Sequence, residues 1–213
     1  MSPPTDAHGP MFGRPWAWAL LAVLLLALPA MAVWWRSPPA LERYTPLPGF
    51  SLLNQQDQTL TSLDLRGQVV LVNFIFTRCP DVCPLLSARM AWLRRNLPAQ
   101  ALGGHPIVLV SITVDPEWDR VPQLAAYAER WGAQLPGWQF LTGDPEQVRQ
   151  VIADFQQVAE VVDRSGEVPA IAHSERILLI DPAGVVRGFY PSDEDSLEQL
   201  RRDAHRLARS AEP

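Results

Sequence analysis

Residues 69–83 read VVLVNFIFTRCPDVC, an apolar run that leads directly into the only two cysteines of this 213-residue chain. The run Val69–Phe76 has Asn73 as its single polar residue, which is typical of a central strand buried on both faces of a sheet. Cys79 and Cys83 follow it, where the strand pattern gives way to a helical one. Two thiols at this spacing serve either as a reversible disulfide or as two thiolates on one soft metal ion.

Strand and helix patterns alternate through the rest of the chain, and their order predicts the fold class. The expected strands are a short one from Thr59, then Pro106–Val114, Trp138–Leu141, Ile177–Ile180 and Val185–Tyr190, and the expected helices are Cys83–Asn96, Val121–Trp131, one capped by Asp144, and Asp195–Arg209. Asp181–Gly184 is a turn signal that joins the last two strands into a hairpin. We therefore expect an α/β domain with a central mixed β-sheet flanked by helices.

One uncharged stretch dominates the amino-terminal region. Residues 16–35 read WAWALLAVLLLALPAMAVWW, which as a helix would span the about 30 Å of a bilayer core with tryptophans at both ends. The alternative is a cleavable signal peptide with Ala30-Met31-Ala32 as its cleavage site. Both interpretations export the rest of the chain, and the paired tryptophans favour a retained anchor. We expect a single-pass protein of the inner (cytoplasmic) membrane, with its soluble domain on the periplasmic or extracytoplasmic side.

The predicted organisation has four parts. They are a cytoplasmic segment over residues 1–15, the transmembrane anchor over 16–35, a proline-rich linker over 36–49, and one domain over 50–213. The formal net charge of −5 provides no basic surface for nucleic acid, so we expect no nucleic-acid partner. In an outer, oxidising compartment the cysteine pair would form a disulfide unless a reductant or a metal holds it.

The position of the thiols bears on their reactivity. Cys83 falls in the first turn of the predicted helix, and a helix amino terminus favours the thiolate form. Three residues separate the cysteines, one more than in the C-x-x-C motif of thioredoxin-type enzymes, and the wider loop leaves room for an ion. Two thiolates select Cu(I) or Zn(II) over hard ions. Holding Cu(II) as well calls for a third, nitrogen ligand.

Four histidines could supply that nitrogen, and they differ in position. His8 precedes the uncharged stretch, His105 lies in a glycine-containing turn, and His205 lies on the polar terminal helix. His173 lies just before the predicted strand Ile177–Ile180, after a polar loop. From its position alone, a ligand role and a structural role for His173 are equally open.

Four motifs in order resemble one family. FTRCPDVCP (residues 76–84), VDPEWD (114–119), FLTG (140–143) and AHSERILLIDPAG (172–184) together resemble the Sco/SenC family, from about Pro46 to the end of the chain. Members of this family are membrane-anchored copper proteins with a thioredoxin fold that act in cytochrome c oxidase assembly. The resemblance therefore implies a thioredoxin-like domain that handles Cu(I), Cu(II) or both.

The resemblance also implies roles for particular residues and partners. The family's copper ligands fall on Cys79, Cys83 and His173, and its motif aspartate falls on Asp115, beside the site as a support for the ligands or a contact for a partner. The implied recipient of copper is cytochrome c oxidase subunit II or another apoprotein with a copper site. A copper donor protein and a thiol reductant are implied as further partners.

Two residues bear on how closely the chain follows the family. Family members often carry aspartate directly before the ligand histidine, and this chain has Ala172, so a hydrogen-bond partner for His173 is missing or comes from elsewhere. Arg78 directly precedes Cys79, and a cation there would lower the pKa of the Cys79 thiol. A solvated loop arginine is an equally open interpretation of Arg78.

The leading hypothesis is a copper metallochaperone that holds one copper ion and delivers it to the dinuclear copper centre of subunit II. The alternative is an enzyme, a thiol–disulfide oxidoreductase in which Cys79 and Cys83 are the redox-active pair that keeps the partner's copper-binding cysteines reduced. A peroxiredoxin-like peroxidase is disfavoured because Thr77 lies two residues before Cys79, where that class has threonine three before.

Overall fold

The structure, a computed structural model, describes residues 15–36, 39–99, 104–133, 137–157, 159–163, 168 and 170–210. The predicted cytoplasmic segment lies outside these residues, apart from Pro15. The chain divides into two compact units, one that ends at Ala40 and one that begins at Leu41.

The first unit contains α1 (Pro15–Arg36), a continuous helix of 22 residues over the stretch predicted to be a membrane anchor. Large apolar side chains along α1 are exposed, among them Trp18, Leu25 and Leu26. None of the helices that the structure describes is both long and apolar enough to cross a bilayer. The structure thus confirms a helix over this stretch but does not confirm a membrane span.

The second unit is an α/β domain built on a mixed sheet of seven strands in the order β2-β1-β5-β4-β3-β8-β9. Its elements are β1 (Ser51–Asn54), β2 (Thr59–Thr61), the 3₁₀ helix η2 (Ser62–Leu65), β3 (Val69–Ile75), α2 (Val82–Asn96), β4 (Ile107–Thr113), α3 (Val121–Arg130), β5 (Trp138–Thr142), α4 (Pro145–Asp154), β6 (Ala159–Asp163), β7 (Ala170–His173), β8 (Ile177–Ile180), β9 (Val186–Tyr190) and α5 (Glu194–Arg209). The strands β3, β4 and β5 are parallel, and the others join them antiparallel. The predicted mixed sheet is confirmed.

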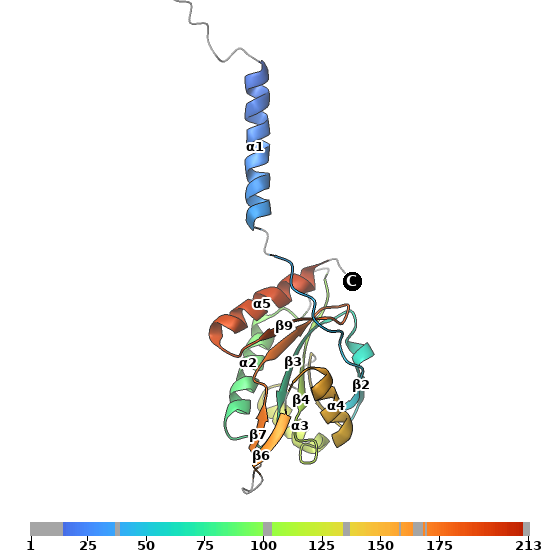
Figure 1. Ribbon diagram of the computed structural model, residues 1–213. Helices are drawn as coiled ribbons and strands as arrows, with labels where there is room; N and C mark the ends of the chain where they lie inside the picture. The colour runs from blue at the N-terminus through green and yellow to red at the C-terminus, as the bar shows by residue number, and fades with distance from the viewer. Residues whose placement is uncertain are drawn as a thin grey trace, which may run out of the picture. The chain divides into compact units, whose positions relative to one another are not determined.

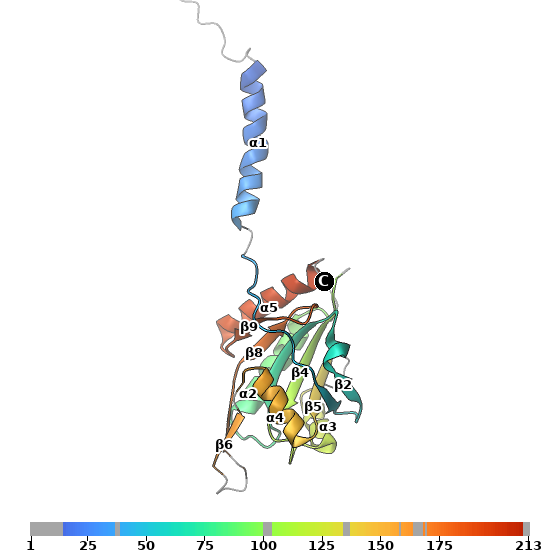
Figure 2. The ribbon, with the colours of Figure 1, turned by 45° about the vertical axis from the view of Figure 1, so that its right-hand side comes forward.

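The central strand β3 is buried along its whole length because both faces of the sheet are covered. Its side chains alternate between two apolar clusters: Leu71 and Ile75 pack with residues of α2, α3 and α5, whereas Val72 and Phe74 pack with residues of α4. Figures 1 and 2 show α2 and α5 on one face of the sheet and α4 on the other. This burial on both faces explains the nearly continuous apolar run in the sequence.

Residues 41–49 belong to the folded domain, although we expected them in a free linker. Tyr44 donates its N–H to the Val186 carbonyl, and the Val186 N–H donates to the Thr45 carbonyl, both at 2.9 Å, as in an added edge strand. The guanidinium of Arg187 donates to the Leu41 and Glu42 carbonyls at 2.6 and 2.7 Å. We predicted a linker because the segment is rich in proline. However, proline allows an extended backbone to lie against a sheet edge as readily as in solvent.

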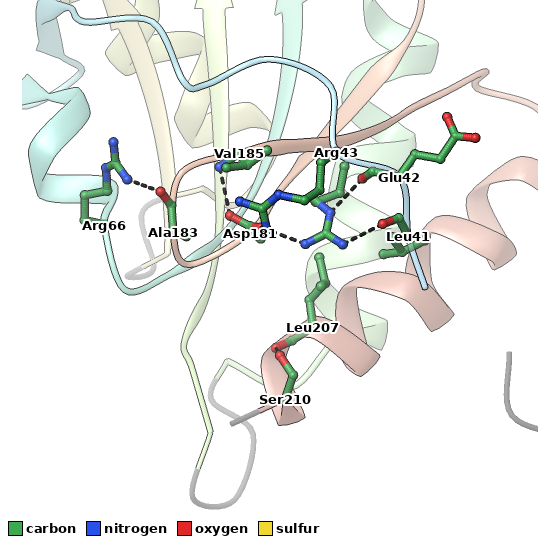
Figure 3. Close-up of polar contacts among 10 residues, drawn as sticks. Leu41, Glu42, Arg43, Arg66, Asp181, Ala183, Val185, Leu207 and Ser210 are labelled. Atoms are coloured by element: carbon green, nitrogen blue, oxygen red, sulfur yellow. Dashed lines mark hydrogen bonds and ion pairs between the residues drawn. The ribbon is translucent and has the colours of Figure 1, made fainter. Parts of the chain in front are cut away.

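Arg187 can hold this segment because its charge is paired inside the domain. It donates to the Asp181 carboxylate at 2.8 Å, and only 10% and 5% of the two side chains are exposed. Asp181 also accepts the N–H of Val185 at 2.8 Å within the turn between β8 and β9 (Figure 3). One buried ion pair therefore joins the β8–β9 turn to the amino-terminal edge of the domain.

Two parallel strands place two of the sequence motifs, FTRCPDVCP and VDPEWD, at one edge of the sheet. Ile75, the last residue of β3, is in register with Thr113, the last residue of β4. Because parallel strands end at the same edge, the segment that carries the cysteines and the segment Val114–Asp119 emerge side by side. The strands β6 and β7 form a separate antiparallel pair, which the sequence analysis did not predict (Figure 1).

Candidate functional site

The two cysteines occupy different environments at the junction of β3 and α2. Cys79 lies in the turn, partly exposed, and donates its N–H to the Phe76 carbonyl at 3.2 Å. Cys83 lies in the first turn of α2 and is fully buried, and its Sγ accepts the Phe76 N–H at 3.5 Å. No disulfide joins the two cysteines. The structure thus presents one accessible sulfur and one enclosed sulfur.

Burial controls the protonation of Cys83. Loss of water around the thiol raises its pKa well above the ordinary value, the Phe76 N–H opposes this, and the nearby Cys79 thiol raises it further. The prediction that the amino terminus of α2 would favour a thiolate is therefore wrong for Cys83, because desolvation outweighs the helix dipole. A metal ion that binds this sulfur must displace its proton.

Arg78 is held by two neighbours from the loop after β4. Its Nε and Nη2 atoms donate to Asp115 Oδ2 at 3.0 and 2.8 Å, and its guanidinium carbon lies 4.5 Å from the centre of the Trp118 ring. Only 24% of the Arg78 side chain and 10% of the Asp115 side chain are exposed. Arg78 is thus not a solvated loop residue, and much of its charge is directed at Asp115 rather than at Cys79.

Asp119 is a site residue that the sequence analysis missed. It is completely buried, and its carboxylate accepts the Thr77 N–H at 3.0 Å, the Thr77 hydroxyl, and the Thr113 hydroxyl at 2.6 Å. Burial raises the pKa of Asp119, although these hydrogen bonds oppose the shift. The sequence signal was present, since threonines stand at the ends of two adjacent strands and need a common acceptor.

These contacts fix the loop that carries Cys79. Thr77 precedes Cys79 by two residues, and its backbone and side chain are both bound to Asp119. The Asp119 N–H donates in turn to the Asp115 carbonyl at 2.8 Å, so the two aspartates belong to one tight turn. The loop after β4 therefore holds the cysteine loop twice, through Asp119 to Thr77 and through Asp115 to Arg78.

The strand that contains His173 borders the same region. In the β6–β7 pair, His173 is in register with Ala159, and the placement of its side chain lies outside what the structure describes. A cavity of about 400 Å³ is lined by Arg78 and Asp115 on one side and by Ala159 and Ile171 of this strand pair on the other. Ile171 also packs against the same apolar cluster as Cys79. The backbone of β7 therefore lies beside the cysteine loop.

The described side chains supply two sulfur donors and no complete metal site. No group of three or more His, Cys, Asp and Glu side chains close enough to hold a metal occurs among them. Two thiols at a constrained turn fit a soft ion such as Cu(I), and Asp115, the nearest hard donor identified from the sequence, is already bound to Arg78. The role of His173 as a third ligand stays a prediction.

Comparison with known proteins identifies relatives of this chain. The sequence profile of the SCO1/SenC family matches residues 40–209. The mitochondrial SCO2 homolog of Bos taurus is 35% identical over 158 residues, which cover 74% of this chain and 58% of that protein. The chain thus spans less than two thirds of the length of this relative.

Solved structures agree with the sequence relatives. Bradyrhizobium japonicum ScoI with copper bound superposes with a TM-score of 0.66 at 25% identity, covering 77% of this chain and 99% of that one. BsSco, described as a member of the Sco family of cytochrome c oxidase assembly proteins with a disulfide switch, gives a TM-score of 0.63 at 27% identity, over 81% and 99% of the two chains. The domain alone accounts for nearly all of each solved chain, so a domain of this extent folds on its own in these relatives. The expected thioredoxin-like fold is confirmed, and the chain belongs to the SCO1/SenC family.

Proposed function

We propose that this chain is a copper carrier, which holds one copper ion through Cys79, Cys83 and His173 and passes it to an apoprotein with a copper site, such as the dinuclear copper centre of cytochrome c oxidase subunit II. The observation that carries the proposal is the pair of neighbouring thiols, one accessible and one enclosed, where the loop that carries Cys79 is fixed from two sides. The family membership and the copper-bound ScoI structure support copper as the cargo.

The asymmetry of the two thiols suits a transfer by ligand exchange. A partner thiolate can reach copper on the side of Cys79, which is partly exposed, while the buried Cys83 continues to hold the ion. Cys79 then dissociates, a second partner ligand takes its place, and Cys83 is displaced last. Each exchange replaces one sulfur donor by another, so the ion stays coordinated throughout.

A second function is favoured by the same asymmetry and by the disulfide switch described for BsSco. If the protein is an oxidoreductase, the Cys79 thiolate would attack a partner disulfide. This attack forms a mixed disulfide and releases one partner thiol. Cys83 would then attack the Cys79 sulfur, which closes the Cys79–Cys83 disulfide and releases the second partner thiol. Two electrons pass from this chain to the partner, and His173 takes no part in either step.

One experiment separates the two functions. Residues 38–213 are reduced and titrated with Cu(I) and Cu(II), and reduction of a disulfide-containing recipient peptide is measured on the same sample. Stoichiometric copper binding, with sulfur-to-copper charge-transfer absorption for Cu(II), supports the carrier. A protein that reduces the peptide but binds neither form of copper is an oxidoreductase, and the carrier proposal then falls.

An exported, membrane-attached location is part of the proposal. The large apolar side chains that the structure describes between Trp16 and Met31 are exposed, with 65% of Leu25 and 74% of Leu26 accessible, and such a surface requires lipid or protein to cover it. The paired tryptophans at both ends of residues 16–35 support a retained anchor in the inner membrane. Membrane fractions washed with alkaline carbonate should retain the full chain, and its release into the supernatant would exclude an integral anchor.

A further inference from the structure

Helix α2 has a second apolar stripe, which the core covers only in part. Its inner face contributes Cys83, Leu86 and Met90, all completely buried. Leu85, Ala88 and Trp92 are spaced as i, i+3 and i+7 and form a stripe on another side of the helix, where 49% of Leu85 is exposed. A surface helix normally places polar residues at exposed positions, so the packing of the domain explains Trp92 but not the exposed Leu85.

The stripe forms one wall of a groove against α5. The groove has a volume of about 490 Å³, and Leu197 of α5 lies opposite Leu85, Ala88 and Trp92. This volume is within the range of sites that bind ligands or the side chains of a partner. Its floor is apolar, because Leu197 is 5% exposed and Trp92 packs partly into the core beneath it.

The rim of the groove is acidic. Its charged lining residues are Arg89 on α2 and Glu194, Asp195 and Glu198 on α5, three carboxylates against one guanidinium. Glu198 is paired with Arg201 at 2.7 Å within α5. Among the described residues no cation lies within ion-pairing distance of Glu194 or Asp195, so these two carboxylates are open to a cation from outside.

The groove lies next to the end of α2 that carries Cys83. Leu85 follows Cys83 by two residues on α2, a rise of about 3 Å along the helix. A polypeptide segment that lies in the groove therefore reaches the end of α2 that carries the cysteines. The lining of the groove does not include Arg78, Asp115 or the β6–β7 strands, so it is distinct from the cavity beside the cysteine loop.

We propose that this groove is a docking site for an amphipathic segment of a partner protein, with leucine-like side chains on the apolar floor and lysine or arginine beside Glu194 and Asp195. This inference rests on the proposed function, in which the partner is the protein that takes copper from Cys79 or whose disulfide Cys79 reduces. The acidic rim selects a basic segment because like charges on an acidic segment would be repelled.

The test uses residues 38–213, reduced and free of metal, at physiological ionic strength. The probe is the synthetic amphipathic peptide LKKLLKLLKKLLKL, and a matched peptide with glutamate in place of each lysine is its control. Affinities are measured by isothermal titration calorimetry. We expect the lysine peptide to bind at least about tenfold more tightly than the glutamate peptide.

Matched variants then locate the binding. Leu85→Ser and Glu194→Lys should each weaken binding of the lysine peptide by about tenfold. Leu63→Ser, at a leucine that is 75% exposed on η2, and Glu129→Lys, at an exposed glutamate on α3, should leave the affinity unchanged. Equal effects of each variant and its control, equal binding of the two peptides, or no binding would overturn the docking site.

Different results would contradict the docking site and the proposed function. Cys79→Ser removes the accessible thiol but leaves the groove intact, so this variant should bind the lysine peptide as the unchanged protein does, and a loss of binding would overturn the groove. A protein that binds the peptide but no copper would instead overturn the copper carrier and leave the docking site standing.

Discussion

The backbone N–H of Thr77 donates to the carboxylate of Asp119 at 3.0 Å, which ties the residue two positions before Cys79 to a completely buried acid. The Thr77 and Thr113 hydroxyls complete the coordination of this carboxylate. The position of the accessible thiol therefore depends on a residue at the far end of another loop. Asp119 acts on Cys79 only through the backbone of this loop.

Removal of the Asp119 carboxylate should destabilise the domain and loosen the cysteine loop. Asp119→Ala leaves the Thr77 N–H, the partly buried Thr77 hydroxyl and the buried Thr113 hydroxyl without an acceptor, and we expect the free energy of unfolding to fall by about 2–4 kcal/mol. Urea denaturation measures this loss. Glu129→Ala, at an exposed acid, is the control, and an equally small effect of both variants would show that the Asp119 contacts carry little energy.

The raised pKa of Asp119 predicts a particular dependence of stability on pH. Because the folded carboxyl binds its proton more tightly than the unfolded one, the Asp119 contribution to stability is greatest below about pH 4 and declines as pH rises through its raised pKa. Asp119→Asn cannot titrate, so the stability of the unchanged protein relative to this variant should decrease from about pH 4 toward neutrality. A difference that grows with pH would contradict the sign of the shift.

The two thiols should differ in their rates of alkylation. Cys79 is partly exposed, whereas Cys83 is buried and its pKa is raised by desolvation, so we expect iodoacetamide to modify Cys79 at least about a hundredfold faster. Mass spectrometry of peptides from the reduced, metal-free domain measures both rates. In urea the rates should converge, and equal rates in the folded protein would contradict the burial of Cys83.

The amino-terminal strap, residues 41–47, should contribute to stability through Arg187. Arg187→Ala leaves the buried Asp181 with only the longer contact to the exposed Arg43, at 3.9 Å, and releases the Leu41 and Glu42 carbonyls, so we expect a loss of about 3 kcal/mol in the free energy of unfolding. Arg202→Ala removes a surface ion pair of an arginine that is 60% exposed and should cost less than about 0.5 kcal/mol. Similar losses in thermal or urea unfolding would mean that the strap is not held by Arg187.

The fully buried strands β3 and β8 could be predicted from the sequence, whereas the exposed strand β6 could not. The run Val69–Ile75 and the ILLI run of β8 are apolar because both faces of the sheet are covered, and this leaves a plain signal. In β6 the four residues Glu160–Asp163 are exposed, so no alternation marks it as a strand. The strap was missed for a related reason, since backbone hydrogen bonds to β9 hold it and they leave no pattern in its side chains.

Of the residues of the candidate site, too, only some could be predicted from the sequence. The cysteines could be identified because they are the only two in the chain, and Asp115 because its motif resembles that of a known family. Asp119 could not be assigned because the motif VDPEWD contains three acids, and only folding shows which of them is enclosed. The pairing of Arg78 with Asp115 and Trp118 is likewise a contact between loops that are distant in sequence.

The central claim is a copper ion held by two thiols and one imidazole, and copper titration of His173→Ala tests it most directly. Two thiolate ligands suffice to bind Cu(I), whereas Cu(II) also requires the nitrogen donor. We therefore predict that the variant binds Cu(I) within about tenfold of the unchanged protein and loses Cu(II) affinity by at least about a hundredfold, together with the sulfur-to-copper charge-transfer bands. Equal losses for both oxidation states, or no loss for either, would contradict His173 as a ligand.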